Sequence, residues 1–366
     1  MARICHISIV GPADDQRVFL RECRTLAKAG HDVSMIVRHD REEVRDGVRF
    51  IPVRPARNRF VRMIRNVPLA LWLALRQRAD LYHVHDPELA LAGVVLKLLT
   101  RAKIVYGVRE DHPRMMRHKF YMPWLLRVVM SYLVQFVEQF SSRLFFNAVV
   151  AVTDDIGDNF RRHPRVLIIK NYPILTPAPL RKEDGPFTLL YVGSMTKIRG
   201  LLGMIETIER MDGDARLLLA GTFGPAELEQ EARAMPGWAR VDYAGYVDVL
   251  QSPEFFARAD VGLVVVLPER HHLTALPLKM FDYMGARLPV IASNFPLWSE
   301  IVEGNACGIC VDPLDPDAMA AAAKRLRDDP ALRREMGERG RRAVEEKYNW
   351  DSEAKRLLAL YDELLA

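Results

Sequence analysis

The sequence predicts an α/β protein with two domains, each built on a parallel sheet. Short apolar runs alternate with helical patterns along the chain, and a proline-rich stretch at residues 171–179 interrupts this alternation near the middle. A length of 366 residues also exceeds what one hydrophobic core usually serves. The composition, 49% apolar and 27% charged, excludes a disordered or fibrous chain.

The first half has the pattern of a doubly wound sheet. We expect strands at residues 4–10, 31–37, 81–84, 103–108 and 148–152, separated by a helix that ends at Gly30 and by helices at 67–78, 88–99 and 121–146. In such sheets, binding residues lie in the loops that follow the carboxyl ends of the strands. The candidate binding loops of this half are therefore residues 11–17, 85–88, 109–113 and 153–155.

The second half repeats the pattern. We expect strands at 187–192, 216–220, 241–243, 261–266, 290–292 and 308–311, with helices near 200–210, 226–234, 250–258, 277–286, 297–303 and 315–328. The expected organisation is a domain at 1–172, a linker at 173–186, a domain at 187–348 and a last helical segment at 349–366. Two Rossmann-like domains facing a central cleft are the predicted architecture.

Charge and composition narrow the function classes. Residues 1–175 carry 29 Lys and Arg against 17 Asp and Glu, whereas residues 176–366 carry 23 against 30. Either the basic half faces phosphates or an anionic lipid surface, or the chain is arginine-rich with no functional asymmetry. Four cysteines and a start without signal-peptide shape predict a cytoplasmic protein. Nucleic acid is not an expected partner, because no helix-turn-helix signal or interleaved aromatic pattern accompanies the basic residues.

Several strings, in their order and spacing, resemble family 4 glycosyltransferases of the GT-B fold. They are residues 12–22, 85–89, 191–200, 276–284 and 288–293. The resemblance is to the retaining enzymes that build bacterial capsule, exopolysaccharide or lipopolysaccharide. It implies transfer of a sugar from a nucleotide-diphosphate donor, UDP- or GDP-linked, to a saccharide or lipid-diphosphate-linked acceptor. It also implies that the segment 349–366 is a helix returning to the N-terminal domain, and that no cofactor is needed.

The loop at 193–200 is the first candidate donor site. A leaving diphosphate gains negative charge in the transition state, so catalysis needs fixed positive charge and N–H dipoles beside it. Gly193 ends a strand, and the following loop offers backbone amides at a helix start together with Lys197 and Arg199. We expect Arg199 to contact the diphosphate, with Lys197 as the second candidate. The alternative is that both are solvated loop charges.

The helix that begins near Pro277 is the second candidate donor element. Proline in a first turn leaves the initial amides free for an anion, here beside Leu278 and Lys279. The resemblance places Asp282 on the ribose hydroxyls, where the family usually has Glu. It places Thr274 where many members have a sugar-binding Glu. The alternative for this helix start is a capping role alone.

The resemblance gives recognition of the base to Tyr246 and Val247, together with residues near 222–223. It leaves uracil, guanine and adenine open, because backbone groups do the reading. No Asp-x-Asp pair ends a strand, so we expect no metal at the diphosphate and a metal-independent reaction.

The acceptor-side candidates are Asp15, His85, Arg109 and Glu110. The resemblance places the catalytic-loop His of the family at Arg109, which cannot act as a base because arginine does not deprotonate. Arg109 can instead hold a phosphate or a carboxylate with two hydrogen bonds. His85 with Asp86 is either a tautomer-fixing pair or part of a structural loop. In retaining transfer the departing diphosphate can accept the acceptor proton, so Arg109 is compatible with activity.

Two other functions remain open from the sequence. The chain is alternatively a weakened or non-catalytic GT-B protein that binds nucleotide or glycan, or a GT-B sugar-nucleotide epimerase. Membrane contact is a further expectation: the basic, aromatic-bearing stretch at 113–145 and Arg57, Arg59, Arg62 and Arg65 suggest peripheral attachment to the cytoplasmic face of the inner membrane. The alternative is that the stretch at 113–145 is a core helix.

Overall fold

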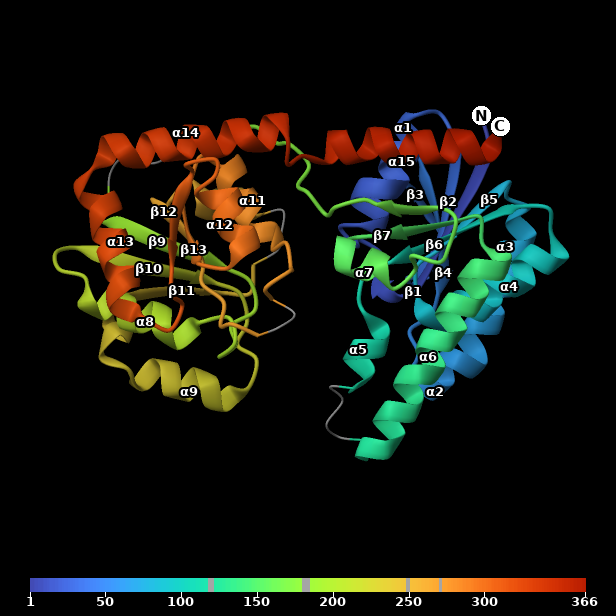
Figure 1. Ribbon diagram of the computed structural model, residues 1–366, viewed down its shortest axis with the longest axis horizontal. Coiled ribbons are helices and arrows are strands. Elements are labelled where there is room, and N and C mark those ends of the chain that lie inside the picture. Colours follow the sequence, from blue (N-terminus) through green and yellow to red (C-terminus); the bar gives the residue numbers. More distant parts are fainter. Residues whose placement is uncertain (118–121, 180–184, 248–250, 270–271) are drawn as a thin grey trace. The chain divides into compact units, whose positions relative to one another are not determined.

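The computed structural model describes residues 1–117, 122–179, 185–247, 251–269 and 272–366. The chain divides into two compact units (Figure 1). Unit 1 comprises Met1–Asn171 together with Asp351–Ala366, and unit 2 comprises Tyr172–Trp350. The last helix, α15 (Trp350–Leu365), therefore packs with the N-terminal part of the chain, which confirms the predicted return of the C-terminal helix.

Unit 1 is built on a mainly parallel sheet. Its described strands follow the order β3-β4-β2-β1-β5-β6-β7-β8, and β3 runs antiparallel to β4. The strands are β1 (Arg3–Pro12), β2 (Asp32–Arg38), β3 (Glu43–Arg45), β4 (Val48–Val53), β5 (Leu81–Val84), β6 (Lys103–Val108), β7 (Ala148–Ala151) and β8 (Val166–Ile168). The predicted parallel sheet is confirmed, and β3, β4 and β8 are strands that the sequence analysis missed.

The order of the strands positions the binding loops of unit 1. From β1 the chain winds outward to β2 and β4, then returns to β5 and continues on the other side through β6, β7 and β8. This reversal makes the neighbouring strands β1 and β5 the switch point of the sheet, where the loops diverge and leave a crevice. Asp15, His85 and Arg109 all lie in loops that follow β1, β5 and β6.

Helices cover the sheet of unit 1, and apolar side chains of β1, β5, β6 and β7 form its core with them. The helical segments are η1 (Val18–Cys23), α1 (Arg24–Lys28), α2 (Arg59–Val61), η2 (Arg62–Asn66), α3 (Val67–Gln77), η3 (Pro87–Leu89), α4 (Ala90–Leu99), α5 (His112–Arg117), α6 (Trp124–Phe145) and α7 (Asp154–Asp158). The segments η1 and η2 are π-helices, a form that is rare and frequent at functional sites.

Unit 2 has a parallel sheet with the strand order β11-β10-β9-β12-β13-β14 in its described residues. The strands are β9 (Phe187–Val192), β10 (Ala215–Ala220), β11 (Val241–Gly245), β12 (Val261–Val264), β13 (Val290–Ser293) and β14 (Gly308–Val311). Its switch point lies between β9 and β12, so the loop that follows β9 lies at the crevice of this sheet. The second predicted Rossmann-like sheet is thereby confirmed.

The helices of unit 2 are mostly those expected: α8 (Leu201–Arg210), α9 (Ala226–Ala234), η4 (Pro236–Arg240), α10 (Ser252–Phe256), α11 (Leu278–Gly285), α12 (Pro296–Val302), α13 (Pro316–Asp328) and α14 (Pro330–Glu346). The sequence analysis missed α14, whose two glycines weaken its helical signal. A β-carbon at Gly337 would lie 2.2 Å from the carbonyl oxygen of Arg287. Glycine there lets α14 approach the backbone that follows α11.

Candidate functional site

Two cations from different elements of unit 2 meet beside Gly193. Arg199 comes from the loop between β9 and α8, and Lys279 comes from the first turn of α11. A β-carbon at Gly193 would lie 3.1 Å from Lys279 Nζ and 3.7 Å from Arg199 Nη1. Arg199 Nη1 also donates a hydrogen bond to Ser194 Oγ at 2.7 Å, which holds the guanidinium at the loop. The parallel sheet thus brings together two of the predicted donor-site residues.

Among the described residues, Lys279 has no anionic partner at hydrogen-bonding distance. Its Nζ is buried, has no hydrogen-bond partner within the described residues, and lies 3.7 Å from the centroid of the Tyr191 ring. Burial, and then the positive charge of Arg199, lower the pKa of Lys279 well below its usual range. An unpartnered buried ammonium beside a second cation is costly. A bound diphosphate would relieve both the desolvation and the repulsion.

Lys197 does not join this pair. Its Nζ lies 2.6 Å from Glu231 Oε2 of α9, and both side chains are well exposed. An exposed ion pair of this kind contributes little to binding or stability. Lys197, the second candidate of the loop, therefore points to a surface carboxylate. The cation that lies beside Arg199 is Lys279, which was predicted from a different segment.

The remaining donor-side candidates surround α11 or follow β11. Asp282 lies one turn beyond Lys279 and acts on it as a negative charge. Leu278 begins the helix, and Thr274 lies exposed in the segment before it. Tyr246 is 76% exposed just after β11, and Val247 next to it is half-buried. The side chain of Tyr246 is thus accessible to a ligand. Within the described chain it makes no hydrogen bond with Lys279.

Arg109 is the charged centre of the unit 1 site. Its Nη1 lies 2.8 Å from Asp15 Oδ2, and its Nη2 lies 3.7 Å from Asp86 Oδ1. The other oxygen of Asp15 accepts hydrogen bonds from the backbone amides of Arg17 and Val18, at the start of η1. Asp15 therefore positions the guanidinium. A quarter of the Arg109 side chain remains exposed for a ligand.

His85 and Asp86 do not form the tautomer-fixing pair. Asp86 Oδ2 accepts hydrogen bonds from the amides of Ile9 and Val10, at 2.6 and 3.1 Å, so it joins the loop after β5 to the end of β1. Burial raises the pKa of Asp86 to about 6. The orientation of His85 comes instead from His6, whose Nδ1 lies 2.9 Å from His85 Nε2. Asp86 therefore acts as part of a structural loop, which is the second of the two roles left open by the sequence.

His85, Asp86 and Arg109 lie at the wall of a cavity of about 710 Å³ in unit 1 and form its polar end with Glu110. Glu110 is exposed. The rest of the wall is largely apolar and was not predicted: Met63, Leu91, Met115, Met116, Met130, Leu133, Val134 and Val137. A cavity with a charged end and an apolar wall suits an amphipathic ligand.

Further charged groups at the cavity wall pair with one another. Arg62 holds Glu88 with two hydrogen bonds of 2.6 and 2.7 Å, and Arg59 Nε lies 3.0 Å from the same carboxylate. On another side, Glu138 Oε1 is 2.7 Å from His112 Nδ1 and accepts a hydrogen bond from the Tyr106 hydroxyl at 2.6 Å.

Helix α6 buries several polar residues and exposes many apolar ones. Ser131, Glu138, Ser141 and Ser142 are buried. The exposed side chains include Trp124, Leu125, Leu126, Val129, Tyr132, Leu133, Phe136, Phe140 and Leu144, which we call the α6 face. The alternative prediction, that the stretch at 113–145 is a core helix, is therefore wrong for α6. No helix among the described residues is long and apolar enough to cross a membrane. His118, Lys119, Phe120 and Tyr121 of the predicted stretch lie outside the described residues.

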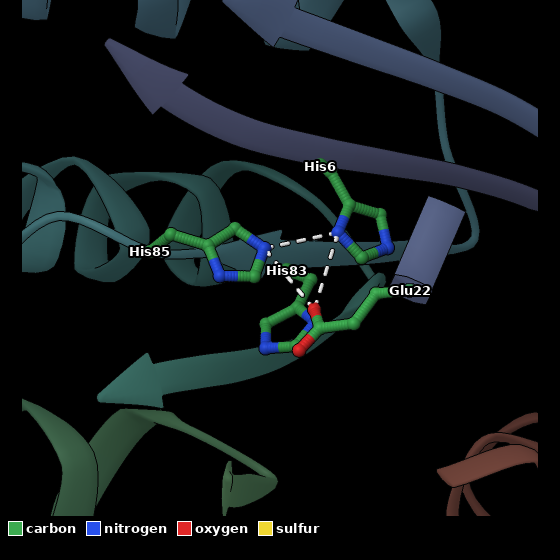
Figure 2. A group of neighbouring side chains, drawn as sticks. All are labelled: His6, Glu22, His83 and His85. Carbon is green, nitrogen blue, oxygen red and sulfur yellow. Dashed lines mark hydrogen bonds and ion pairs between the residues drawn. The ribbon is translucent and has the colours of Figure 1, made fainter. Parts of the chain in front are cut away.

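The sequence analysis missed a buried cluster around His85. His6, Glu22 and His83 lie with it inside unit 1 (Figure 2). Burial lowers the pKa of His6 and of His83 to about 3, so both imidazoles are neutral. One signal was present: His83 and His85 are two residues apart at the end of a strand, and this spacing places both on one face.

Comparisons with known proteins identify the family of the chain. The family model "Glycosyl transferase 4-like domain" matches residues 16–171, and the model "Glycosyl transferases group 1" matches residues 186–329. The two matches follow one another and between them take in most of the chain. The chain belongs to the group 1 glycosyltransferases of family 4 type. The resemblance inferred from the sequence is thereby confirmed.

Individual relatives are distant. The chain is 31% identical over 188 residues to alpha-D-kanosaminyltransferase from Streptomyces kanamyceticus, which is 50% of this chain and 47% of that protein. The chain spans about half the length of the first curated relatives it matches.

Solved structures match over the whole chain. Sucrose-phosphate synthase from Thermosynechococcus elongatus has a TM-score of 0.80 and 21% identity, covering 100% of this chain and 99% of that one. HepE from Anabaena, solved in complex with UDP-glucose, has a TM-score of 0.75 and 12% identity, covering 99% and 100%. At these identities the likeness establishes the fold, which is GT-B as predicted.

Proposed function

We propose that this chain is a retaining glycosyltransferase that moves a sugar from a nucleotide-diphosphate donor to a lipid-diphosphate-linked saccharide at a membrane surface. The observation that carries the proposal is the pair of cations at Gly193, where Lys279 Nζ is buried without a partner in the described chain. Family membership and the UDP-glucose bound to the similarly folded HepE support a nucleotide sugar as the donor. UDP and GDP are the nucleotides expected.

The donor unit supplies charge where charge develops. As the bond between the anomeric carbon and the β-phosphate oxygen breaks, negative charge grows on the departing diphosphate. Arg199 and Lys279, together with amides of the loop that precedes α8, would oppose that charge from fixed positions. Asp282 lies one turn from Lys279 and is the candidate for the ribose hydroxyls. A preformed cationic site of this kind lowers the barrier more than it strengthens substrate binding.

Arg109 does not need to act as a base in this mechanism. The acceptor oxygen bonds to the anomeric carbon on the face that the diphosphate leaves, and its proton passes to the departing phosphate oxygen. The configuration at the anomeric carbon is thereby retained. Arg109, fixed by Asp15 and Asp86, would orient the acceptor by two hydrogen bonds to a phosphate or sugar oxygen. Glu110 and His85 line the same cavity and complete its polar end.

An amphipathic acceptor suits the cavity of unit 1. Its charged end can hold a diphosphate or sugar, and its methionine- and leucine-rich wall can hold part of a hydrocarbon chain. The α6 face presents Trp124, Phe136 and their neighbours to solvent, which is typical of a helix that lies in a lipid interface. Peripheral attachment to the cytoplasmic face of a membrane, within cell-surface polysaccharide synthesis, is the setting that these features support.

A nucleotide screen tests the donor half of the proposal. Thermal stability is measured with UDP, GDP, ADP and their sugar derivatives. We expect one nucleotide family to raise the melting temperature, and the matching sugar nucleotide to be hydrolysed slowly without acceptor. If no nucleotide raised the melting temperature, the proposed donor site would be contradicted. Stabilisation without hydrolysis or transfer would instead favour the non-catalytic alternative.

The acceptor half is tested with vesicles that contain a polyprenyl-diphosphate-linked sugar and, separately, with the free saccharide. We expect transfer to the lipid-linked form to be faster, with the donor's anomeric configuration kept in the product as determined by NMR. Inversion would contradict the mechanism, and faster transfer to the free saccharide would contradict the lipid-linked acceptor.

A further inference from the structure

The cluster of His6, Glu22, His83 and His85 has a composition that the glycosyl-transfer mechanism does not use. Three imidazoles and one carboxylate direct one ligand atom each toward a common point, and these atoms all lie within 4.8 Å of one another (Figure 2). All four residues are buried. We propose that these four side chains form a structural Zn²⁺ site in the interior of unit 1.

The fold brings the four residues together from three elements. His6 lies in β1 and is paired in register with His83 of the parallel neighbour β5, and His85 directly follows β5. Glu22 comes from the π-helix η1. A β-carbon at Gly107 of β6 would lie 2.6 Å from His85 Nδ1 and 2.8 Å from His83 Nε2. Glycine on the adjacent strand therefore leaves the space that two imidazole rings occupy.

The distances fit a small tetrahedral ion. His6 Nδ1 lies 2.9 Å from His85 Nε2, and Glu22 Oε2 lies 3.8, 3.5 and 3.7 Å from His6 Nδ1, His83 Nδ1 and His85 Nε2. With metal–ligand bonds of about 2.0–2.1 Å, neighbouring ligands of a tetrahedral zinc are roughly 3.3 Å apart. Shifts of a few tenths of an ångström would bring Glu22 Oε2, His6 Nδ1 and His85 Nε2 to bonding distance around one ion. The His83 ring, whose ligand atom lies within 4.8 Å of the others, would have to move further.

Within the described chain, one carboxylate oxygen of the cluster has no hydrogen-bond donor. Glu22 Oε1 accepts a hydrogen bond of 2.6 Å from Arg17 Nε, so the carboxylate is held in place, but the buried Glu22 Oε2 has no hydrogen-bond partner. A buried carboxylate oxygen without a donor is rare and costly. A cation between Glu22 and the three imidazoles removes that cost.

The donor set selects the metal. Imidazole nitrogens with one carboxylate suit zinc and its first-row neighbours, whereas Mg²⁺ and Ca²⁺ prefer oxygen ligands. A site with four protein ligands in tetrahedral geometry leaves no open position for a substrate. We therefore assign a structural role, and the ion would link β1, β5 and η1 beneath the acceptor loops.

Tyr361 connects the C-terminal helix to this site. Its hydroxyl is 2.6 Å from His83 Nδ1 and 3.4 Å from His6 Nε2. His83 Nδ1 cannot accept a hydrogen bond from Tyr361 and bind a metal with the same lone pair, so the hydroxyl must release it. Tyr361 is thus a competitor of the ion.

The site also has a link to the acceptor cavity. His85 lines that cavity as well as the cluster. With Nε2 bound to the metal, His85 must carry its hydrogen on Nδ1. The ion would therefore fix the tautomer of a residue at the polar end of the acceptor cavity.

The experiment uses the full chain after treatment with a chelator. Zn²⁺ is added back, and metal content after dialysis and the melting temperature are measured. We expect one Zn²⁺ per chain and a higher melting temperature, and we expect Glu22→Gln and His83→Gln to lose both effects. His39→Gln is the matched control, because His39 Nε2 lies 3.3 Å from Glu43 Oε1 outside the cluster. Zinc bound equally by all variants, or not bound by the wild type, would overturn the proposal.

Two further measurements remain informative if the cluster variants do not fold. Titration of the chelated wild type with Co²⁺ should give the intense visible absorption of a tetrahedral ion, and the weak spectrum of an octahedral ion would contradict the site. Tyr361→Phe should bind Zn²⁺ several-fold more tightly, because one competing hydrogen bond is removed. Weaker binding by this variant would contradict the assigned ligand set.

Discussion

The cationic side chains of the two units differ in whether they have an anionic partner in the described chain. In unit 2, Lys279 Nζ is buried beside a second cation and has no hydrogen-bond partner in the described chain. In unit 1, Arg109 is held by Asp15, and Arg62 is held by Glu88. Lys279 of unit 2 lacks an anion in the described chain, whereas Arg109 and Arg62 of unit 1 each have a carboxylate partner. We therefore expect a ligand of unit 2 to be held mainly by charge, and a ligand of unit 1 to be held by apolar contact as well as by Arg109.

The first consequence concerns Arg109, which should affect the rate of transfer and leave nucleotide binding unchanged. We expect Arg109→Ala to lower the transfer rate by roughly 100-fold or more, the usual effect of removing one preorganised donor. The affinity for the nucleotide, measured by calorimetry, should change less than about twofold, because the donor contacts come from unit 2.

Arg24→Ala is the control for this variant, since Arg24 also pairs with an aspartate of unit 1, Asp46, at 3.2 Å. It should leave both rate and affinity close to the wild type. Parallel loss of rate and affinity in Arg109→Ala would remove the distinction between the two units.

The second consequence concerns Lys279 and has two opposite parts. Lys279→Met should weaken nucleotide binding by about 10- to 100-fold, because a charge-assisted hydrogen bond contributes about 1.5–3 kcal/mol. The same change should raise the melting temperature of the free protein, since it removes a buried amino group that has no hydrogen-bond partner in the described chain.

Lys197→Met is the matched control, because Lys197 lies in the loop that carries Arg199 but pairs with the exposed Glu231. We expect it to alter neither quantity measurably. If Lys197→Met weakened binding as much as Lys279→Met, the diphosphate would have to lie at the other side of the loop.

The sequence predicted the loops of these sites better than the directions of their side chains. Alternating strands and helices imply a parallel sheet, and a parallel sheet places its binding loops at one edge, so Arg109, Arg199 and Lys279 could be singled out. The direction of Lys197 could not, because the position of Glu231 on α9 depends on how α9 packs against the sheet.

The buried cluster was missed for a related reason. His6 and His83 are far apart in the sequence, and they meet because β1 and β5 are neighbours in this register. Local spacing cannot reveal such a pairing, although the His83 and His85 spacing indicated one shared face. The inverted polarity of α6 was likewise ambiguous, since an apolar helix reads the same whether a core or a lipid surface covers it.

A third prediction sharpens the claim that unit 1 relies on apolar contact. The double variant Trp124→Ser, Phe136→Ser should lower partitioning onto anionic vesicles roughly tenfold, because both side chains are exposed on the α6 face. Leu314→Ser is the control: Leu314 is exposed in unit 2, where no such face is proposed. Cosedimentation with vesicles measures both. Equal binding by the double variant and the wild type would contradict membrane contact through α6.

The smallest expected effect is a pH dependence of nucleotide binding. Burial and Arg199 lower the pKa of Lys279 in the free protein, and a bound diphosphate would raise it again. Binding should therefore take up protons between these two pKa values, and affinity should fall as pH rises through this window. Calorimetry in buffers of different ionisation enthalpy measures the uptake. Lys279→Arg stays charged and should show none. Equal uptake in this variant would assign the proton to another group, and Lys279 would then be charged already in the free protein.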